Sequence, residues 1–459
     1  MADKAKEKKG IWNWIDNIQG DKVIWMIVLL LIMISIIAIF SSTSMLSTST
    51  VSRFDIFKEQ LFIVALGLGI ILACYFIPKI WIFRVLSQFG FAISAGMLLM
   101  LLGHISTVEI NGAVRAIRIG GLQLNVYEFV KVGMILYLSW AVHAYKADEL
   151  WIANRLAKRF KFLEFIGRPG WKRIIYIHFP ILFVCLCVLA GSFSSAMFIG
   201  AMMFATIIIG GIPFKDILYV GFIAVIAIIS SYGIYKISGG KVFKRWGTVE
   251  KRIERFFSPQ PADELKEGTV EWNEYIDNMR QPEGAKLAIR EGGLTGKGPG
   301  RSTQKYAVAL MFSDYMFSFI LEEYGLLGAF VMIVLYVSLL ARGSIIVRNC
   351  DNTYAKTAVA GLVILISGQA MMHMYINVGL GPLTGQTLPM VSHGNSSFLA
   401  FSIAFGVLLS ISKMAKKKVE QQAEMAGPLV DHSDDDIRAG LDDLDQLESM
   451  DSFDEVSNG

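Results

Sequence analysis

The sequence predicts an all-α integral membrane protein with about ten transmembrane helices. Of its 459 residues, 54% are hydrophobic and 18% are charged, and the mean hydropathy is +0.51. Soluble domains carry about 25% charged residues. Residues 23–40 form an apolar run interrupted only by Ser35, which is close to the roughly 20 residues that cross a bilayer. Further apolar runs follow it, and this argues against a cleaved signal peptide.

Ten apolar runs lie between charged or Gly/Pro-containing breaks, and we predict one span in each. This threading places residues 144–173, with eight Lys and Arg, on the same side of the membrane as the Lys-rich N-terminus. The positive-inside rule then places both termini in the cytoplasm. The predicted spans are 23–41, 60–78, 82–103, 128–144, 174–190, 195–212, 216–236, 314–341, 355–378 and 396–412.

The threading divides the chain into a cytoplasmic N-terminal segment (1–22), a membrane domain (23–412) and an acidic cytoplasmic tail (413–459). The tail has few large apolar residues, which predicts disorder; a short helix that binds a partner is the alternative. A long extracytoplasmic loop (238–313) joins spans seven and eight, and from Gly239 onward it carries thirteen Lys and Arg against ten Asp and Glu. It is either a solvated loop with internal ion pairs or a surface for anionic partners.

The cysteines and histidines predict neither a disulfide framework nor a zinc site. Three of the four cysteines lie within apolar runs, and the six histidines show no pair at metal-ligand spacing. We therefore expect no transition metal held by the protein, and we expect no nucleic acid among its partners.

The first of four polar clusters leads into the fourth span. Residues 111–121 contain four glycines or asparagines and Arg115, and Glu128 and Lys131 follow at the start of the span. Ionisable residues are costly in hydrocarbon, so they mark candidate functional positions. Because Glu128 and Lys131 lie three residues apart on one helix face, the alternative is that they neutralise each other.

The second cluster is the glycine-rich stretch Gly292–Gln304, at the end of the long loop. Five glycines allow backbone N–H groups to converge on an anion, and Lys297 and Arg301 add positive charge. The stretch lacks the spacing of a nucleotide-binding P-loop. A flexible hinge is the alternative interpretation.

The third cluster begins the eighth span. We predict that Asp314 lies where this span meets the outer surface, partly desolvated, which suits a general base. Glu322 and Glu323 lie deeper and need partners, such as Lys131, Arg115 or helix ends. A purely structural network is the alternative role for the two glutamates.

The fourth cluster, residues 384–397, enters the last span. Pro389 and small polar residues including Ser392 and Ser396 predict irregular backbone, which is tolerated at membrane depth only inside protein or against a cavity. His393 could titrate near neutral pH, although a hydrogen-bonded structural histidine is the favoured interpretation.

At these positions the chain resembles the SEDS (shape, elongation, division and sporulation) family of bacterial cell-wall synthesis, over residues 20–412. Five motifs of that family match in order. They are Asn111-Gly112-Ala113…Arg115; Glu128-Phe129…Lys131; Gly292-Gly293…Gly296…Gly298…Gly300…Ser302…Gln304; Asp314…Phe317 with Glu322-Glu323…Gly325; and Thr384-Gly385…Leu388-Pro389…Ser392…Gly394…Ser396-Ser397.

The resemblance implies an inverting peptidoglycan glycosyltransferase that polymerises lipid II at the outer leaflet and releases undecaprenyl pyrophosphate. Asp314 falls on the family's catalytic aspartate. The substrate-binding candidates are Arg115, Glu128, Lys131, Lys297, Arg301, Gln304, Ser392 and Ser396, and the structural candidates are Glu322, Glu323 and Pro389. Such a transfer needs a base for the attacking hydroxyl and stabilisation of the departing pyrophosphate. A divalent cation, Mg or Mn, is compatible with this chemistry, but the sequence assigns it no ligands.

The resemblance also implies the partners lipid II, the nascent glycan strand, a class B penicillin-binding transpeptidase, other division proteins and membrane lipid. Gly298-Pro299-Gly300 and Glu322–Gly325 resemble division-type members, so we expect the cytoplasmic membrane at the septum; a role in elongation is the alternative. A lipid II flippase or other transporter and a noncatalytic scaffold are further alternatives. The polar clusters gather at the outer mouth and no internal repeat is evident, which disfavours a transporter.

Overall fold

The computed structural model describes residues 19–43, 53–110, 113–119, 122–240, 245–257, 269–308 and 310–426. Asn111, Gly112, Gly120 and Gly121 lie outside the described residues, as do 1–18 of the N-terminal segment and 427–459 of the acidic tail. The chain divides into two units, 1–415 and 416–459, and residues 416–426 of the second are helical.

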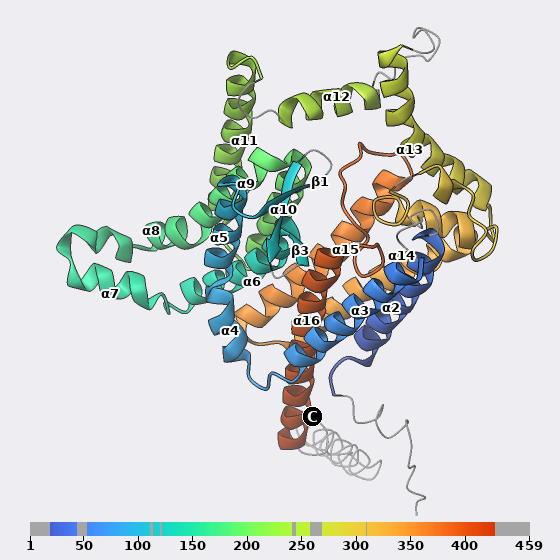
Figure 1. Ribbon diagram of the computed structural model, residues 1–459. Helices are drawn as coiled ribbons and strands as arrows, with labels where there is room; N and C mark the ends of the chain where they lie inside the picture. Colours follow the sequence, from blue (N-terminus) through green and yellow to red (C-terminus); the bar gives the residue numbers. More distant parts are fainter. Residues whose placement is uncertain are drawn as a thin grey trace, which may run out of the picture. The chain divides into compact units, whose positions relative to one another are not determined.

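Helices make up most of the structure (Figure 1). In chain order they are α2 (Lys22–Ser42), α3 (Arg53–Tyr75), α4 (Ile80–Gln88), α5 (Gly90–Leu102), α6 (Val126–Lys146), α7 (Trp151–Arg159), the 3-10 helix η2 (Lys161–Gly167), α8 (Pro169–Arg173), the π-helix η3 (Ile174–His178), α9 (Phe179–Gly191), α10 (Phe193–Ile209), α11 (Phe214–Ile237), α12 (Arg245–Phe257), α13 (Val270–Gly292), the 3-10 helix η5 (Gln304–Tyr306), α14 (Met316–Asn349), α15 (Thr353–Asn377) and α16 (Asn395–Ala426).

Each of the ten predicted spans coincides with a helix or a continuous run of helices. Within the described residues, eight segments are long and apolar enough to cross a membrane, and α4–α5 and α8–α9 each count as one of them. The helix α10 is apolar but shorter, and α6 has 21 residues with Glu128 in its first turn. The predicted helical multi-pass fold is confirmed, whereas the number of crossings and the orientation stay predictions.

Polar side chains fix where several of these helices begin. Asp21 Oδ1 accepts the backbone N–H of Val23 at 2.9 Å at the start of α2. Asn125 caps α6 and Asn352 caps α15 in the same way. These residues satisfy N–H groups that have no partner in the first turn of a helix.

The helix α6 lies between the two main hydrophobic clusters of the protein. Its Val132 and Ile135 belong to the cluster formed chiefly by α2, α14, α15 and α16. Its Val130 and Met134 belong to the cluster formed by α5, α9, α10 and α11. The charged residues at the start of α6 are therefore placed in the middle of the bundle.

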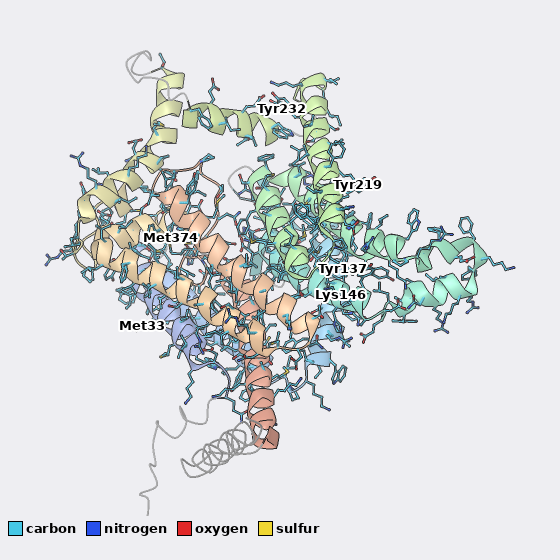
Figure 2. The ribbon with its side chains drawn as sticks, turned by 180° about the vertical axis from the view of Figure 1, so that it is seen from behind. Met33, Tyr137, Lys146, Tyr219, Tyr232 and Met374 are labelled. Atoms are coloured by element: carbon cyan, nitrogen blue, oxygen red, sulfur yellow. The ribbon has the colours of Figure 1, made fainter. Side chains whose placement is uncertain are left out.

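Large apolar side chains also cover the outside of the bundle. Tyr219 on α11 is 64% exposed and Met33 on α2 is 50% exposed, and Figure 2 shows both on the periphery. An apolar outer surface of this kind is what a helix presents to lipid.

Two segments between predicted spans contain structure that the sequence analysis did not predict. Residues 104–127 include an antiparallel sheet of three strands in the order β1 (Thr107–Ile110), β2 (Ala113–Ile119) and β3 (Leu122–Asn125). The long loop, 238–313, contains α12 and α13, the latter with Pro282 in its interior.

Candidate active site

Asp314 lies in a tight turn that immediately precedes α14. Its backbone N–H donates to Leu310 O at 3.0 Å, and Asn377 Nδ2 on α15 donates to Asp314 O at 3.0 Å. Ser392 Oγ donates to Ser313 O at 2.7 Å. The turn is thus fixed through its backbone from two other segments, and the Asp314 side chain takes no part in those bonds.

Arg115 lies on β2, at an irregular point of the sheet. Val108 faces Ala116 and Glu109 faces Val114, so the register shifts and Arg115 has no facing residue on β1. A bulge of this kind redirects a side chain and is frequent beside active sites.

Gly385, in the segment between α15 and α16, brings Asp314 and Arg115 to one place. A methyl group on its Cα would lie 3.7 Å from Asp314 Oδ2 and 3.8 Å from Arg115 Nη1. Gly385 has a φ of +69°, a backbone conformation that residues other than glycine rarely adopt. A carboxylate and a guanidinium from segments far apart in the sequence therefore flank the same small space.

Lys131 is buried and holds the segment that contains Gly385. Its ammonium group donates to Glu128 Oε1 at 2.8 Å, Gln369 Oε1 at 2.6 Å and Gln386 Oε1 at 3.1 Å. A lysine has three such donors, so all are engaged within the protein. This arrangement favours a positioning role for Lys131, with Glu128 as its ion-pair partner.

The sequence analysis missed the polar face of α15, although a signal was present. Gln369, His373 and Asn377 are spaced four residues apart, which places them on one face of an otherwise apolar span. His373 Nδ1 lies 2.8 Å from Gln386 O, and the Phe317 N–H donates to His373 Nε2 at 3.4 Å. This face joins the start of α14 to the segment around Gly385.

Ser396 and Pro389 make structural contacts. Ser396 Oγ accepts the Asn125 N–H at 2.7 Å and donates to Gln123 O at 3.2 Å, which ties β3 to α16. Pro389 O accepts the Tyr336 hydroxyl at 2.6 Å. Both residues therefore stabilise the segments next to the site through contacts within the protein.

His393 also makes contacts within the protein. Its N–H donates to Phe312 O at 2.9 Å, and its Nδ1 lies 3.1 Å from Gln60 Oε1. Burial lowers the pKa of His393 below its usual value, so the ring is neutral at pH 7. This favours the structural interpretation.

The glycine-rich stretch packs against a break in α14. The break is at Gly325, whose φ is 64° and ψ is −161°. The Lys297 N–H donates to Glu322 O and the Gly298 N–H to Glu323 O, each at 2.9 Å. These N–H groups replace helical partners at the break, so they are occupied by the protein's own backbone.

The stretch does surround an anion, and that anion is the Glu322 carboxylate. It accepts Lys297 Nζ at 2.8 Å, Ser302 Oγ at 2.5 Å, and the N–H groups of Thr303 at 2.8 Å and Gln304 at 3.2 Å. Glu322 is fully buried. Of the expected partners, Lys131 and Arg115 were wrong, whereas a helix end was right: Thr303 is the N-cap and Gln304 the first residue of the 3-10 helix η5.

Glu323 has its own partners. It accepts Ser41 Oγ at 2.6 Å, and Lys305 Nζ lies 3.9 Å away. Both glutamates are thus structural in their contacts. Arg301, in contrast, is exposed, and its predicted contact with substrate stays a prediction.

The ion pairs of Lys297 determine how the docking of the glycine-rich stretch depends on pH. Burial lowers the pKa of Lys297, but its hydrogen bonds to Glu291 and Glu322 outweigh burial and raise the pKa above 10.5. The hydrogen bond from Lys297 lowers the pKa of Glu291 below 4.5. The contribution of the Glu291 carboxylate to the stability of the docked stretch is therefore lost only as the pH falls below 4.5. The contribution of the Lys297 ammonium group is lost only as the pH rises above 10.5.

We therefore expect the glycine-rich stretch to stay docked across the whole range between those two values. A spin label at Leu294→Cys, a position 65% exposed, should keep the same mobility between them and become mobile outside them. In a Glu291→Gln background, the part of the acid-induced change that comes from this carboxyl should disappear. A change in mobility near neutral pH would contradict the assignment.

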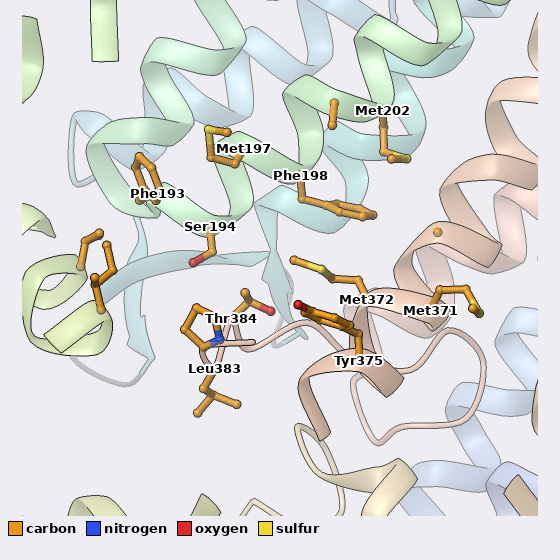
Figure 3. Close-up of a pocket in the computed structure, with 15 residues that line it drawn as sticks. Phe193, Ser194, Met197, Phe198, Met202, Met371, Met372, Tyr375, Leu383 and Thr384 are labelled. Carbon is orange, nitrogen blue, oxygen red and sulfur yellow. The ribbon is translucent and has the colours of Figure 1, made fainter. Parts of the chain in front are cut away.

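A cavity of about 670 Å³ lies beside the site (Figure 3). Its walls are almost entirely apolar and include Phe198 and Met372. Val249 and Ile253 of α12 also line it, so the long loop contributes one wall. Thr384 lines it as well, and the next residue along the chain is Gly385. The apolar cavity and the charged pair are therefore neighbours.

Among the described residues, Asp314 belongs to no group of three side chains able to hold a metal ion. Arg115, a cation, is the charged group that shares the space at Gly385. Across the described ranges, no three His, Cys, Asp or Glu side chains gather closely enough to hold an ion. The divalent cation stays a prediction.

The FtsW/RodA/SpoVE family model, described as cell cycle proteins, matches residues 21–417. The chain belongs to this family. It is the family whose motifs the sequence resembles, and Asp314, Arg115 and Gly385 all lie within the matched range.

Individual comparisons agree with the family membership. The chain is 27% identical over 320 residues to the "Probable peptidoglycan glycosyltransferase FtsW" of Caulobacter vibrioides, covering 70% of each chain. A solved peptidoglycan synthase complex that coordinates polymerization and crosslinking contains a similar chain, with a TM-score of 0.59, 20% identity and coverage of 86% and 98%. The rod shape determining protein RodA of Thermus thermophilus has a TM-score of 0.51 at 20% identity, with coverage of 87% and 98%. The two structures show a shared fold.

Proposed function

We propose that this protein is a peptidoglycan glycosyltransferase that polymerises lipid II at the outer surface of the membrane. The observation that carries the proposal is the meeting of Asp314 and Arg115 at Gly385, beside an apolar cavity. The relative from Caulobacter vibrioides, which is named as a peptidoglycan glycosyltransferase, supports the same activity.

In the proposed mechanism, Asp314 accepts the proton of the attacking sugar hydroxyl. The hydroxyl oxygen forms the new bond to the anomeric carbon from the face opposite the leaving group, and the bond to the pyrophosphate oxygen breaks. Arg115 stabilises the charge that develops on the pyrophosphate.

The cavity suits the lipid part of such a substrate. An isoprenoid chain needs a long apolar surface, whereas the pyrophosphate and sugars need a polar one. Thr384 Oγ1 is buried and has no hydrogen-bond partner among the described residues. The Thr384 hydroxyl lies between the apolar cavity and the charged pair Asp314 and Arg115, where it could donate a hydrogen bond to a pyrophosphate oxygen.

The test is to supply the purified full-length protein, in proteoliposomes, with lipid II. We expect glycan polymer, detected by gel electrophoresis of labelled product. A flippase would instead move lipid II between leaflets without making polymer, and a scaffold would do neither. Transport without polymer, in the presence of a cognate transpeptidase, would overturn the proposal.

We also propose that the protein works with a class B penicillin-binding transpeptidase at the division septum. The similarity to a chain of a synthase complex that joins polymerization to crosslinking supports the partnership. Imaging of a fluorescent fusion tests the location. A midcell band agrees with division, whereas scattered lateral foci would favour the elongation role.

A further inference from the structure

The segment between α6 and α9 forms an arm that projects from the neighbouring helices (Figure 1). We call residues 151–171 the basic arm; they include α7 and η2. Ion pairs fix its base to the bundle. Lys172 Nζ lies 2.6 Å from Asp148 Oδ1, and Arg173 Nε lies 2.9 Å from Asp216 Oδ2 on α11. The charges at the base are therefore neutralised within the protein.

The charges of the basic arm itself are not neutralised. Glu164 is its one acidic residue, against five basic ones, all exposed. None of the five takes part in an ion pair in the part of the chain that the structure describes. They are Arg155, Lys158, Arg159, Lys161 and Arg168. This unbalanced positive charge calls for an anionic partner.

The orientation of α7 gathers much of this charge on one face. Arg155, Lys158 and Arg159 follow Trp151 at spacings of four, seven and eight residues, which places all four side chains on the same side of the helix. The opposite side, with the buried Ala153, packs toward η2. The exposed face is thus the basic one.

Exposed aromatic side chains lie among these charges. Phe162 is 87% exposed, Trp151 60% and Trp171 43%. The Arg155 guanidinium lies over the Trp151 ring at 6.0 Å. Aromatic and basic residues together are typical of a segment that lies in the interfacial layer of a bilayer. A surface facing only water gains nothing from exposing these rings.

The connections of the basic arm keep it next to the membrane. It begins five residues after α6 ends at Lys146, and it ends within the apolar helical run Pro169–Gly191. Both are predicted spans, so the arm is tethered at both ends to the same membrane surface.

We propose that the basic arm binds the anionic phospholipids of that leaflet, through their phosphate groups. The five cations contact headgroups, and Trp151, Phe162 and Trp171 insert into the interfacial layer. This site is separate from Asp314 and does not depend on the polymerase activity. The strength with which the basic arm binds the membrane therefore depends on the anionic lipid content of that leaflet.

Hydrogen exchange of the full-length protein in nanodiscs tests the proposal. We expect the peptides that cover the basic arm to exchange more slowly in phosphatidylcholine with phosphatidylglycerol than in phosphatidylcholine alone. High salt should reverse the effect, because it screens headgroup charge. Free glycerol phosphate at matched concentration should have no effect, since the lipid surface is the ligand.

Removal of three charges by Arg155→Gln, Lys158→Gln and Arg159→Gln should abolish the lipid dependence. Each basic residue near an anionic surface contributes a factor of about five, so the loss is on the order of 100-fold in affinity. The matched control removes Lys416, Lys417 and Lys418 and should keep the effect on the arm. Equal exchange in the two lipid compositions, or an unchanged lipid dependence in the triple variant, would overturn the proposal.

Discussion

Asp314→Asn is expected to reduce polymerisation of lipid II by about 10²–10⁴-fold, the range that general bases contribute. The asparagine amide has nearly the same shape as the carboxylate but cannot accept the proton of the attacking hydroxyl. The turn should keep its conformation, because Asn377 and Ser392 hold it through backbone carbonyls and not through the Asp314 side chain. The rate of polymer formation by the reconstituted protein measures the effect.

Asp55→Asn is the matched control for this substitution. Asp55 has an exposed side chain near the start of α3 and lies 3.8 Å from Lys58 Nζ. Its loss should leave polymerisation within twofold of the wild type, in line with the small effect of surface ion pairs. Full activity in Asp314→Asn, with normal expression and normal binding of the transpeptidase, would refute the assignment of Asp314 as the base.

Much of the fold could be predicted from the sequence because a bilayer imposes one simple requirement on each span. A helix must be apolar over about 20 residues, and that property can be read locally. The predicted spans accordingly coincide with helices from α2 to α16. Asp314 could be placed for the same reason, since it stands at the boundary between a polar segment and an apolar one.

The small sheet and the helices of the long loop could not be predicted in this way. The strands β1–β3 are short and pair with one another through a register shift at Arg115, which no apolar alternation reveals. The helices α12 and α13 are polar and lie outside the spans, so hydropathy is silent about them. Yet the sheet orients Arg115, and α12 provides a wall of the cavity.

The pairing of side chains that lie far apart in the sequence could not be predicted either. Lys131 bonds Gln369 and Gln386, which are more than 200 residues away, and nothing in the local sequence selects these partners from other polar residues. The four-residue spacing on α15 could have identified Gln369, His373 and Asn377 as a polar face. Only the fold shows that this face supports the segment at Gly385.

Glu322→Gln is expected to destabilise the protein, by about 3 kcal/mol or more, the cost of breaking a buried ion pair. The carboxylate is fully buried and accepts Lys297, Ser302 and the backbone of Thr303. A glutamine would present N–H groups to donors and leave the Lys297 ammonium without one of its counter-charges. The melting midpoint of the purified protein should fall, on the order of 5 °C, and the label at Leu294→Cys should become mobile.

Glu283→Gln is the matched control, because Glu283 forms an exposed ion pair with Lys286 at 2.9 Å on α13. Its melting midpoint should be nearly that of the wild type. Combining Glu322→Gln with Lys297→Met should cost less than the sum of the single changes, since the double variant no longer buries an uncompensated charge. Strictly additive effects, or a Glu322→Gln protein as stable as the control, would mean that the glycine-rich stretch is held by its backbone contacts with the break at Gly325. In that case the Glu322 carboxylate would be dispensable for docking, and its burial would need a role in the reaction to explain it.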